Sequence, residues 1–213
     1  MKKILLFIAV LTIPNALFAR PISYPEGWTV MQMNDANSNA FHLHYSPTIK
    51  YSIGYKHEYW RDAKWRFNGA QLNYLVKRFN KPKSQANIYL KNGLGVAYSD
   101  HGKFVNETSE AAFSELAMDW EDRRLFVSYS ARGTYAGDID KFAMQKARVG
   151  VAPYIGDYGD LHSWIMLELE HNPEAKGDEV TLTPLLRFFK DVYLFEVGAN
   201  EDGKVTFNTI IRF

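Results

Sequence analysis

The sequence has no cysteine in its 213 residues and no apolar run long enough to cross a bilayer as a helix. The first absence excludes a fold stapled by disulfides. The second excludes a helical membrane protein, because a spanning helix takes about 20 apolar residues. An excess of charge is missing too, since 25 Lys and Arg stand against 24 Asp and Glu. Nucleic-acid binding needs a net positive surface, so we expect no nucleic-acid partner.

Aromatic residues, by contrast, are abundant: 13 Tyr, 14 Phe and 5 Trp make up 15% of the chain. The mean hydropathy of -0.30 is nevertheless that of a soluble protein. The hydrophobic content of 46% excludes disorder, and the length fits one domain. A fold that explains both facts must place apolar and polar side chains on separate faces.

The N-terminus has the three parts of a secretory signal peptide. Residues 1–3 supply positive charge, residues 4–13 form an apolar run, and Ala19 is the small residue that cleavage requires. The apolar run is too short to span a bilayer as a helix. We therefore predict that residues 1–19 are removed and that residues 20–213 form a single domain.

From residue 20 onward, apolar and polar residues alternate with a period of two, which is typical of β-strands with one apolar face. In residues 50–60, for example, Tyr51, Ile53 and Tyr55 alternate with polar or small residues. Turn-forming clusters separate such segments about every 16 residues. The pattern predicts an all-β, antiparallel up-and-down barrel of about twelve strands, with ten or eight as alternatives. An even number puts both termini on one side.

A sheet with one apolar face either packs that face in a soluble core or closes on itself and turns the face to lipid. The soluble alternative is a periplasmic β-sandwich or lipocalin-like barrel. Aromatic residues near strand ends favour lipid, because aromatic girdles mark the two membrane interfaces. We expect girdle positions at Trp28, Trp60, Trp65, Tyr98 and Trp120. The opposite faces mix charged residues with Gly, Ser and Asn, as a barrel interior does.

The chain ends on an alternating strand, Val205-x-Phe207-x-Thr209-x-Ile211-x-Phe213. Its aromatic last residue and alternating apolar positions resemble the C-terminal assembly signal of bacterial outer-membrane β-barrel proteins, carried here by Phe207, Ile211 and Phe213. The resemblance implies recognition by the barrel-assembly machinery, contact with outer-membrane lipid, and residence in the outer membrane of a Gram-negative cell.

Two segments break the alternation. In residues 65–79 the apolar parity changes between Phe67 and Leu72, and residues 142–151 show a similar change. We interpret each change as a β-bulge or as a strand leaving the bilayer.

If one strand face meets lipid, the other lines the interior with charges of both signs. The predicted interior residues are Lys56, Glu58, Arg66, Lys91, Arg124, Arg132, Arg148, Glu168, Arg187, Glu196 and Arg212. They could line a small porin-like channel for passive passage of small polar solutes. Alternatively, Arg and Glu could pair across a narrow lumen and leave a non-conducting structural barrel. Interspersed small residues favour the channel, and the balance of charge argues against strong ion selectivity.

The size and the charged interior are similar to those of small twelve-strand outer-membrane channels for acidic oligosaccharides. This is a likeness of architecture, and it leaves the solute open.

We do not expect an enzyme, because the adjacent His162 and Ser163 fall on opposite faces of a strand. His42 and His44 share one face and could hold a metal if a third ligand joined them. Hydrogen bonding to neighbours is the simpler role, so we predict no metal and no cofactor.

Overall fold

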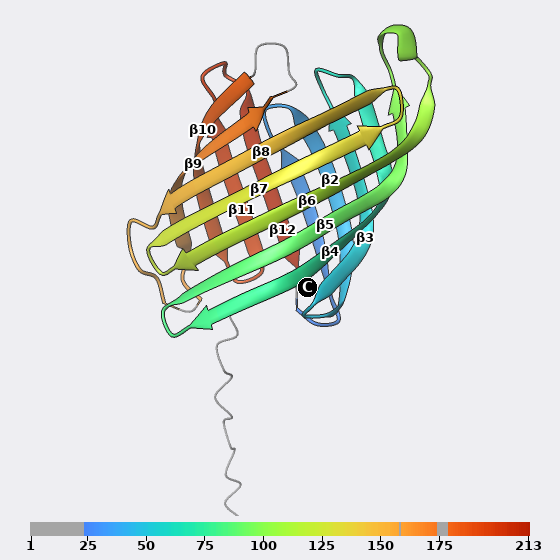
Figure 1. Ribbon diagram of the computed structural model, residues 1–213. Helices are drawn as coiled ribbons and strands as arrows, with labels where there is room; N and C mark the ends of the chain where they lie inside the picture. The colour runs from blue at the N-terminus through green and yellow to red at the C-terminus, as the bar shows by residue number, and fades with distance from the viewer. Residues whose placement is uncertain (1–23, 158, 174–178) are drawn as a thin grey trace, which may run out of the picture.

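The computed structural model describes residues 24–157, 159–173 and 179–213, so the predicted signal peptide, residues 1–19, lies outside the described residues. Over the described ranges, twelve antiparallel strands close into a barrel (Figure 1). The strands are β1 (Gly27–Asn34), β2 (Ser38–Thr48), β3 (Tyr51–Trp60), β4 (Trp65–Lys81), β5 (Ser84–Ser99), β6 (Thr108–Asp122), β7 (Leu125–Ala136), β8 (Asp140–Val151), β9 (His162–Asn172), β10 (Glu179–Lys190), β11 (Tyr193–Ala199) and β12 (Val205–Arg212). A 3-10 turn, η1 (Gly102–Phe104), follows β5. The predicted all-β, up-and-down barrel is confirmed.

The barrel has two distinct ends. Each strand pairs with its neighbours in sequence, and β1 pairs with β12 to complete the ring. The start of β1 therefore lies beside the end of β12, where Thr29 faces Arg212. We call this edge the terminal end; it also carries the turns that follow β2, β4, β6, β8 and β10. The opposite edge, the distal end, carries the turns that follow the odd-numbered strands.

The last residue takes part in closing the barrel. The Trp28 N–H donates to the Phe213 carbonyl at 2.6 Å, and the Phe213 N–H donates to the Trp28 carbonyl at 2.9 Å. Phe213 thus extends the ladder between β1 and β12, and its side chain is 66% exposed on the outer surface.

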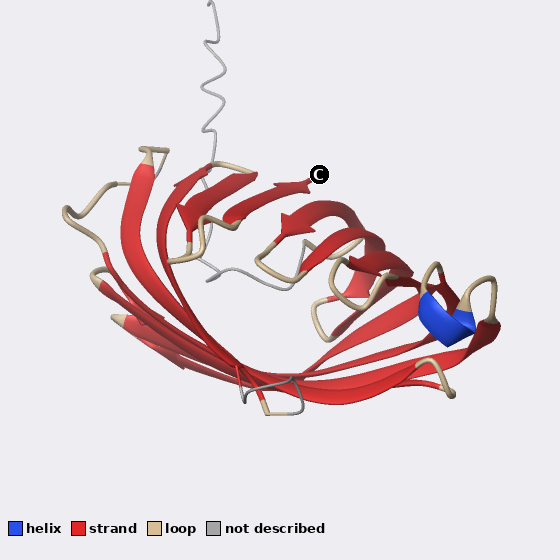
Figure 2. Ribbon diagram, turned by 90° about the horizontal axis from the view of Figure 1, so that it is seen from above, coloured by secondary structure: helices blue, strands red, loops and turns tan. Residues whose placement is uncertain are grey.

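Strand length divides the wall into a tall and a short part. The strands β4, β5 and β6 have 17, 16 and 15 residues, whereas β1, β11 and β12 have 8, 7 and 8. Seen from above, the outline is flattened, with one broadly curved wall facing a shallower one (Figure 2). Flattening brings interior side chains of opposite walls within reach of one another.

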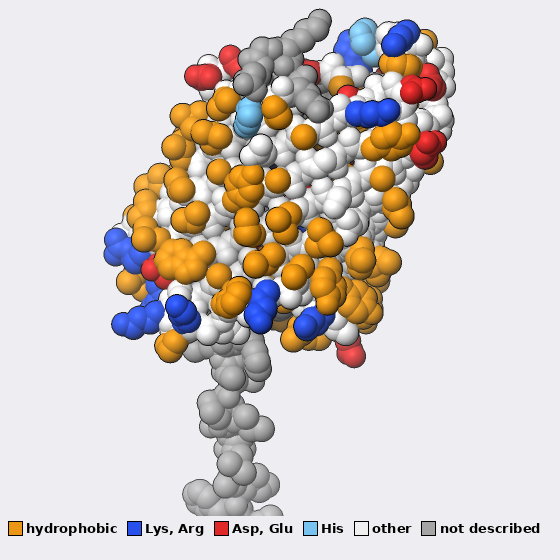
Figure 3. Space-filling model, in the orientation of Figure 1, with side chains coloured by type: hydrophobic (Ala, Val, Ile, Leu, Met, Phe, Trp, Pro, Cys, Tyr) orange, Lys and Arg blue, Asp and Glu red, His pale blue; other side chains and the backbone are white. Residues whose placement is uncertain are grey.

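The outward strand faces carry large apolar side chains that are exposed. Examples spread around the ring are Trp28, Ile53, Leu72, Leu94, Trp120, Val149, Ile165, Leu182 and Phe207. In Figure 3 such side chains spread over the middle of the visible face, and charged side chains gather towards its ends. A closed sheet with an apolar outer band is the arrangement that lipid requires. No helix in the described part of the chain is long and apolar enough to cross a membrane.

Part of the interior is apolar, which corrects the interpretation of the two irregular segments. A cluster that we call the distal plug fills the lumen near the distal end. It consists of Trp60, Trp65, Phe67, Ala97, Ala111, Phe113 and Ala136, with Ile139, Phe142 and Met144 packed against it. The parity changes in β4 and β8 because their inward face becomes apolar there, while the strands keep their orientation. β8 pairs with β7 without a bulge, and the register shift of β4 comes later, between Leu75 and Lys77.

Two predicted girdle positions are wrong for the same reason. Trp60 and Trp65 are 7% and 1% exposed and stack inside the barrel with ring centroids 6.2 Å apart. A narrow lumen has to be filled by side chains, and large aromatic rings fill it well. Trp28 and Trp120, at 43% and 37% exposure, do lie on the outer surface near the terminal end.

Candidate functional site

The barrel interior is the candidate site, because the structure gathers the predicted charged residues there. The strand register and the alternation of buried residues place the following of them on the inward face: Lys56, Glu58, Lys91, Arg132, Arg148, Glu168, Arg187, Glu196 and Arg212. They come from eight strands and meet because alternate residues of every strand point inward.

Two of the predicted interior residues lie elsewhere. Arg66 pairs across the ladder with Tyr59 on the outward face, where its guanidinium lies 5.8 Å and 5.2 Å from the ring centroids of Tyr59 and Tyr98 and forms an ion pair with Asp100. The rule that apolar residues face lipid put Arg66 inside, but its neighbours in β4 are the inward residues of the distal plug. Arg124 lies in the turn between β6 and β7, exposed at the terminal end.

A buried ion triad lies beside the distal plug. Glu58 accepts two hydrogen bonds from Arg132, at 2.9 Å and 2.6 Å, and lies 3.0 Å from the Lys56 ammonium. The exposure of Glu58 and Lys56 is 4% and that of Arg132 is 5%. The Arg132 guanidinium also covers the Phe113 ring at 4.1 Å. The two cations share one carboxylate and an aromatic face, which compensates for their removal from water.

A second network, which we call the central belt, lies at mid-height on the inward faces of five consecutive strands. Glu196 accepts from Arg187 at 2.6 Å and from Asn208 at 2.7 Å, and it lies 3.3 Å from Arg148. Arg148 also pairs with Glu168. Glu168 and Glu196 are each 2% exposed. The belt therefore links β8, β9, β10, β11 and β12 through buried charges of both signs.

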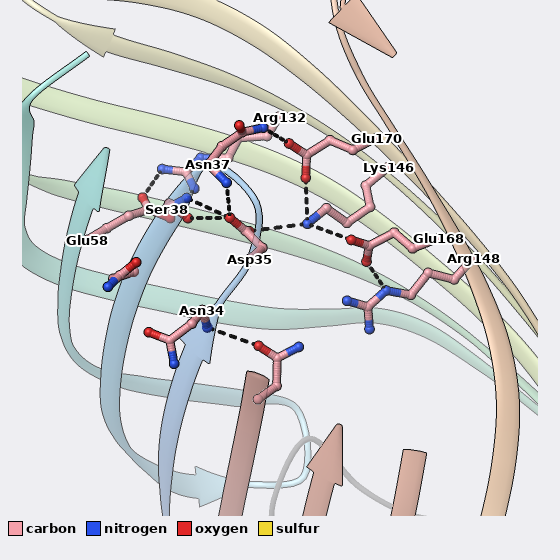
Figure 4. Close-up of polar contacts among 12 residues, drawn as sticks. Asn34, Asp35, Asn37, Ser38, Glu58, Arg132, Lys146, Arg148, Glu168 and Glu170 are labelled. Atoms are coloured by element: carbon pink, nitrogen blue, oxygen red, sulfur yellow. Dashed lines mark hydrogen bonds and ion pairs between the residues drawn. The ribbon is translucent and has the colours of Figure 1, made fainter. Parts of the chain in front are cut away.

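The turn between β1 and β2 joins these networks. It folds inward, so that Asp35 lies 3.4 Å from the Lys146 ammonium, and the Asn37 amide donates to Glu170 at 2.5 Å (Figure 4). Lys146 is also 2.8 Å from Glu170 and 3.5 Å from Glu168. Figure 4 shows the turn lying between Glu58 and Arg132 on one side and Lys146 and the two glutamates on the other.

The electrostatics of this turn favour an ionised Asp35. Burial alone would raise the pKa of Asp35, but the Lys146 ammonium and the N–H groups of Ser38 and Asn37 outweigh burial and lower it. Those N–H groups donate to the Asp35 carboxylate at 2.7 Å and 3.0 Å. Asp35 is thus a negative counter-charge fixed inside the distal mouth.

Lys146, Asp35 and Glu115 are interior charged residues that the sequence analysis did not single out. Lys146 precedes Arg148 by two residues, so the period-two pattern places it on the same inward face. Asp35 carries no comparable signal. Its contact with Lys146 joins residues 111 apart in the chain, and the sequence shows only a polar turn there.

Beside β5 and β6, the interior charges at mid-height are more accessible than those of the triad and the central belt. Lys91 pairs with Glu115 at 2.7 Å, and their side chains are 33% and 17% exposed. Gly93 follows on the inward face of β5, where the Phe113 ring of the distal plug covers it. A second apolar cluster, the terminal plug, lies on the opposite side at the terminal end and comprises Ala152, Trp164, Met166, Leu185 and Phe126.

These exposures describe a closed lumen. A side chain that lines an open aqueous pore is accessible from that pore, whereas the triad and the glutamates of the central belt are nearly inaccessible. What closes the lumen is a set of side chains and one turn, and the backbone wall stays intact around them. The arrangement can serve as a plugged barrel or as a channel whose passage depends on side-chain rearrangement.

The structure also shows where the histidines and the serine considered as metal or catalytic residues lie. His42 and His44 lie on the inward face of β2, and His44 is 5% exposed. Over the described ranges, no group of three or more His, Asp or Glu is arranged to hold a metal ion. His162 pairs with Phe189 and Ser163 with Phe188, on opposite faces of the sheet, and the Ser163 hydroxyl contacts the Tyr154 hydroxyl at 2.9 Å.

Comparison with known proteins rests on structure alone. No protein-family model matches the chain, and no curated protein sequence matches it. A solved structure named KdgM porin superposes with a TM-score of 0.53 and 12% identity, over 88% of this chain and 98% of that one. A structure named KdgM porin in complex with disordered oligogalacturonate gives a TM-score of 0.48 and 11% identity, over 88% and 98%. At such identity the first likeness speaks for the fold, and the chain has the fold of a bacterial outer-membrane β-barrel.

Proposed function

We propose that the mature chain is a porin-like channel of the bacterial outer membrane that lets small polar solutes pass passively. The observation that carries the proposal is a closed barrel with an apolar outer band and an interior crossed by hydrophilic and charged side chains. A barrel whose only task was to pack an apolar core would not bury this many charges, since burial of each one is costly. The likeness in fold to a porin supports the proposal.

The proposal includes lipid and the assembly machinery as partners. Exposed apolar side chains around the ring fit the hydrocarbon part of a bilayer, and Trp28 and Trp120 fit one of its interfaces. Phe207 and Phe213 point outward at the seam that closes the barrel, where a recognition signal is accessible during assembly. Residues 1–19 would direct export and be removed.

The charges of the lumen bear on what passes. Cations and anions are paired inside the barrel, between distant strands as in Glu58 with Arg132 or between adjacent strands as in Glu196 with Arg187. Paired charges leave little net potential, so we expect weak selectivity between anions and cations. The proposal includes no catalytic activity, no metal and no nucleic acid.

The second candidate is a structural barrel that never conducts. This candidate is favoured by the low exposure of Glu58, Arg132, Glu168 and Glu196, because these residues and their ion-pair partners fill the lumen. On this view the ion pairs stabilise the barrel and no solute crosses it.

Reconstitution in a planar bilayer separates the two candidates. Residues 20–213 are refolded in detergent, and the folded state is verified by migration that changes on heating. The channel predicts stepwise conductance at neutral pH with anion-to-cation permeability near unity. If a folded and inserted barrel shows no conductance at any salt concentration or voltage, the channel is excluded and the structural role remains.

A further inference from the structure

The turn of residues 35–37 does not continue the barrel wall but occupies the lumen. The ladder between β1 and β2 ends at the pair of Asn34 and Asn39, and beyond it the turn reaches the opposite wall at Lys146 and Glu170. These contacts join residues 111 and 133 apart in the chain. A surface hairpin turn would make contacts with neighbouring strands only.

At the rim of the distal end, the β11–β12 loop and the β3–β4 turn are in contact above the β1–β2 turn. The Lys204 ammonium, in the β11–β12 loop, lies 3.3 Å from the Asp62 carboxylate, in the β3–β4 turn. Strands β1 and β2 separate those two elements in the ring. Contact between them means that the turn joining β1 to β2 is displaced inward from the rim.

The position of the turn matters because the two plugs leave part of the lumen lined by polar side chains. The distal plug occupies the lumen beside β3 to β8, and the terminal plug occupies it beside β7 to β10. Polar inward side chains lie between them, from Lys91 and Glu115 through the central belt to the distal mouth beside β9 to β12, and we call this series the polar path. At the distal end of that path the inward residues are polar: Glu170, Thr181, Asn200 and Thr206. Residues 35–37 lie in this part of the mouth.

A small number of contacts with other parts of the barrel holds the turn in place. On the lumen side these are the ion pair of Asp35 with Lys146 and the hydrogen bond of Asn37 with Glu170. On the rim side, the Arg61 guanidinium of the β3–β4 turn donates to the carbonyls of Asp35 and Ser38, and the Arg61 backbone N–H donates to the Asn37 carbonyl at 3.0 Å. Arg61 can keep the base of the turn anchored when the lumen contacts are released.

We propose that the β1–β2 turn is a latch that closes the distal mouth of the channel, held shut by the contacts of Asp35 with Lys146 and of Asn37 with Glu170. The inference rests on the proposed channel function and describes how that channel is regulated. Opening moves residues 35–37 out of the polar path towards the rim and lets Lys146 and the side chains of the central belt rearrange, while the plugs and the barrel wall stay in place.

The absence of cysteine from the chain allows a direct test. The variant carrying Asn37→Cys and Glu170→Cys is refolded and recorded in a planar bilayer before and after a short bifunctional thiosulfonate reagent, and again after reduction. The matched control carries Tyr129→Cys and Gln145→Cys, a pair in contact at 2.7 Å on the outer face of β7 and β8. Heat-modifiable migration verifies folding of every sample.

The latch predicts that the uncross-linked double variant is open more often than the wild type, since it lacks one lumen contact. Cross-linking should lower its open fraction by at least about tenfold, because the tether fits the closed arrangement alone. Reduction should restore it, and the control pair should change little. As a variant with little effect on shape, Asp35→Asn should also raise the open fraction without any reagent.

The possible failures are distinct. A cross-linked variant that conducts as well as before cross-linking, in a background where the wild type conducts, would overturn the latch and leave the channel standing. If no conductance is recorded from three folded samples, namely the wild type, Asp35→Asn and the uncross-linked double variant, both the channel function and the latch are overturned.

Discussion

Replacing Glu196 by glutamine removes one charge from the middle of the barrel and leaves the shape almost unchanged. Glu196 is 2% exposed and is shared by Arg187, Arg148 and Asn208. After the change Arg148 keeps its ion pair with Glu168, so the loss falls mainly on Arg187. Its guanidinium would remain in the lumen beside the Phe126 ring, 4.6 Å away, without its carboxylate.

The size of the effect depends on whether water reaches the central belt. Removing one partner of a buried ion pair costs about 3–5 kcal/mol of the free energy of unfolding, because an uncompensated charge stays behind. A solvated pair contributes about 0.2–1 kcal/mol. From the exposures of the belt we expect Glu196→Gln to fall in the upper range.

The assay is reversible urea unfolding of the barrel in phospholipid vesicles, followed by tryptophan fluorescence. Asp157→Asn is the matched control, because Asp157 and Arg123 form an exposed pair at 3.4 Å with side chains 93% and 61% accessible. The control should lose less than about 1 kcal/mol. If Glu196→Gln lost no more than the control, the lumen would be wet at mid-height and our description of a closed lumen would be refuted.

Three further predictions follow from the wall, the plug and the turn. Deleting Phe213 should leave export intact but slow barrel assembly, since two backbone hydrogen bonds with Trp28 close the seam; normal outer-membrane levels of the heat-modifiable form would contradict this. Trp65→Ala should destabilise the barrel by about 3–5 kcal/mol in urea, because Trp65 is 1% exposed and its indole donates to Asp140 at 2.8 Å; a loss below 1 kcal/mol, roughly that of a surface change, would speak against a packed distal plug. The lowered pKa of Asp35 means that its stabilising effect is present above the ordinary value of 3.8 and is lost as pH falls through the lower, folded value. The stability difference between wild type and Asp35→Asn should therefore shrink towards zero in acid, and a difference that persists at the lowest pH would contradict the ion pair with Lys146.

The strand architecture could be predicted because a strand repeats every two residues, and that period is local. The alternation around Tyr51, Ile53 and Tyr55 fixes which side chains share a face, and the even strand number fixes where the termini meet. With the outer face identified as apolar, most of the interior charges follow from counting alternate residues. Lys56 and Glu58 are examples.

The distal plug could not be predicted in the same way. Trp65 and Phe67 are apolar residues that point inward, and hydropathy alone does not distinguish a side chain that fills a narrow lumen from one that meets lipid. Assigning Trp65 and Phe67 to the outer face places Arg66, which lies between them, on the inner face, whereas the structure has it on the outer face. The shape of the interior, which decides where apolar residues are needed, depends on how opposite walls approach.

Contacts between distant parts of the chain also cannot be predicted from local sequence patterns. Asp35 and Lys146 meet because the barrel is flattened and the β1–β2 turn folds inward, and neither property has a signature in a short window of sequence. A polar turn that points outward and one that crosses a lumen share the same composition.

The passage of small polar solutes is the central claim, and liposome swelling tests it most directly. Vesicles that hold the folded mature chain are diluted into isotonic solutions of uncharged sugars of increasing size, with vesicles that hold heat-unfolded protein as the control. We predict swelling that is fast for the smallest sugars, falls steeply with size, and is faster for Asp35→Asn than for the wild type. Vesicles with correctly folded wild type and Asp35→Asn that swell no faster than the control for any sugar would contradict the channel.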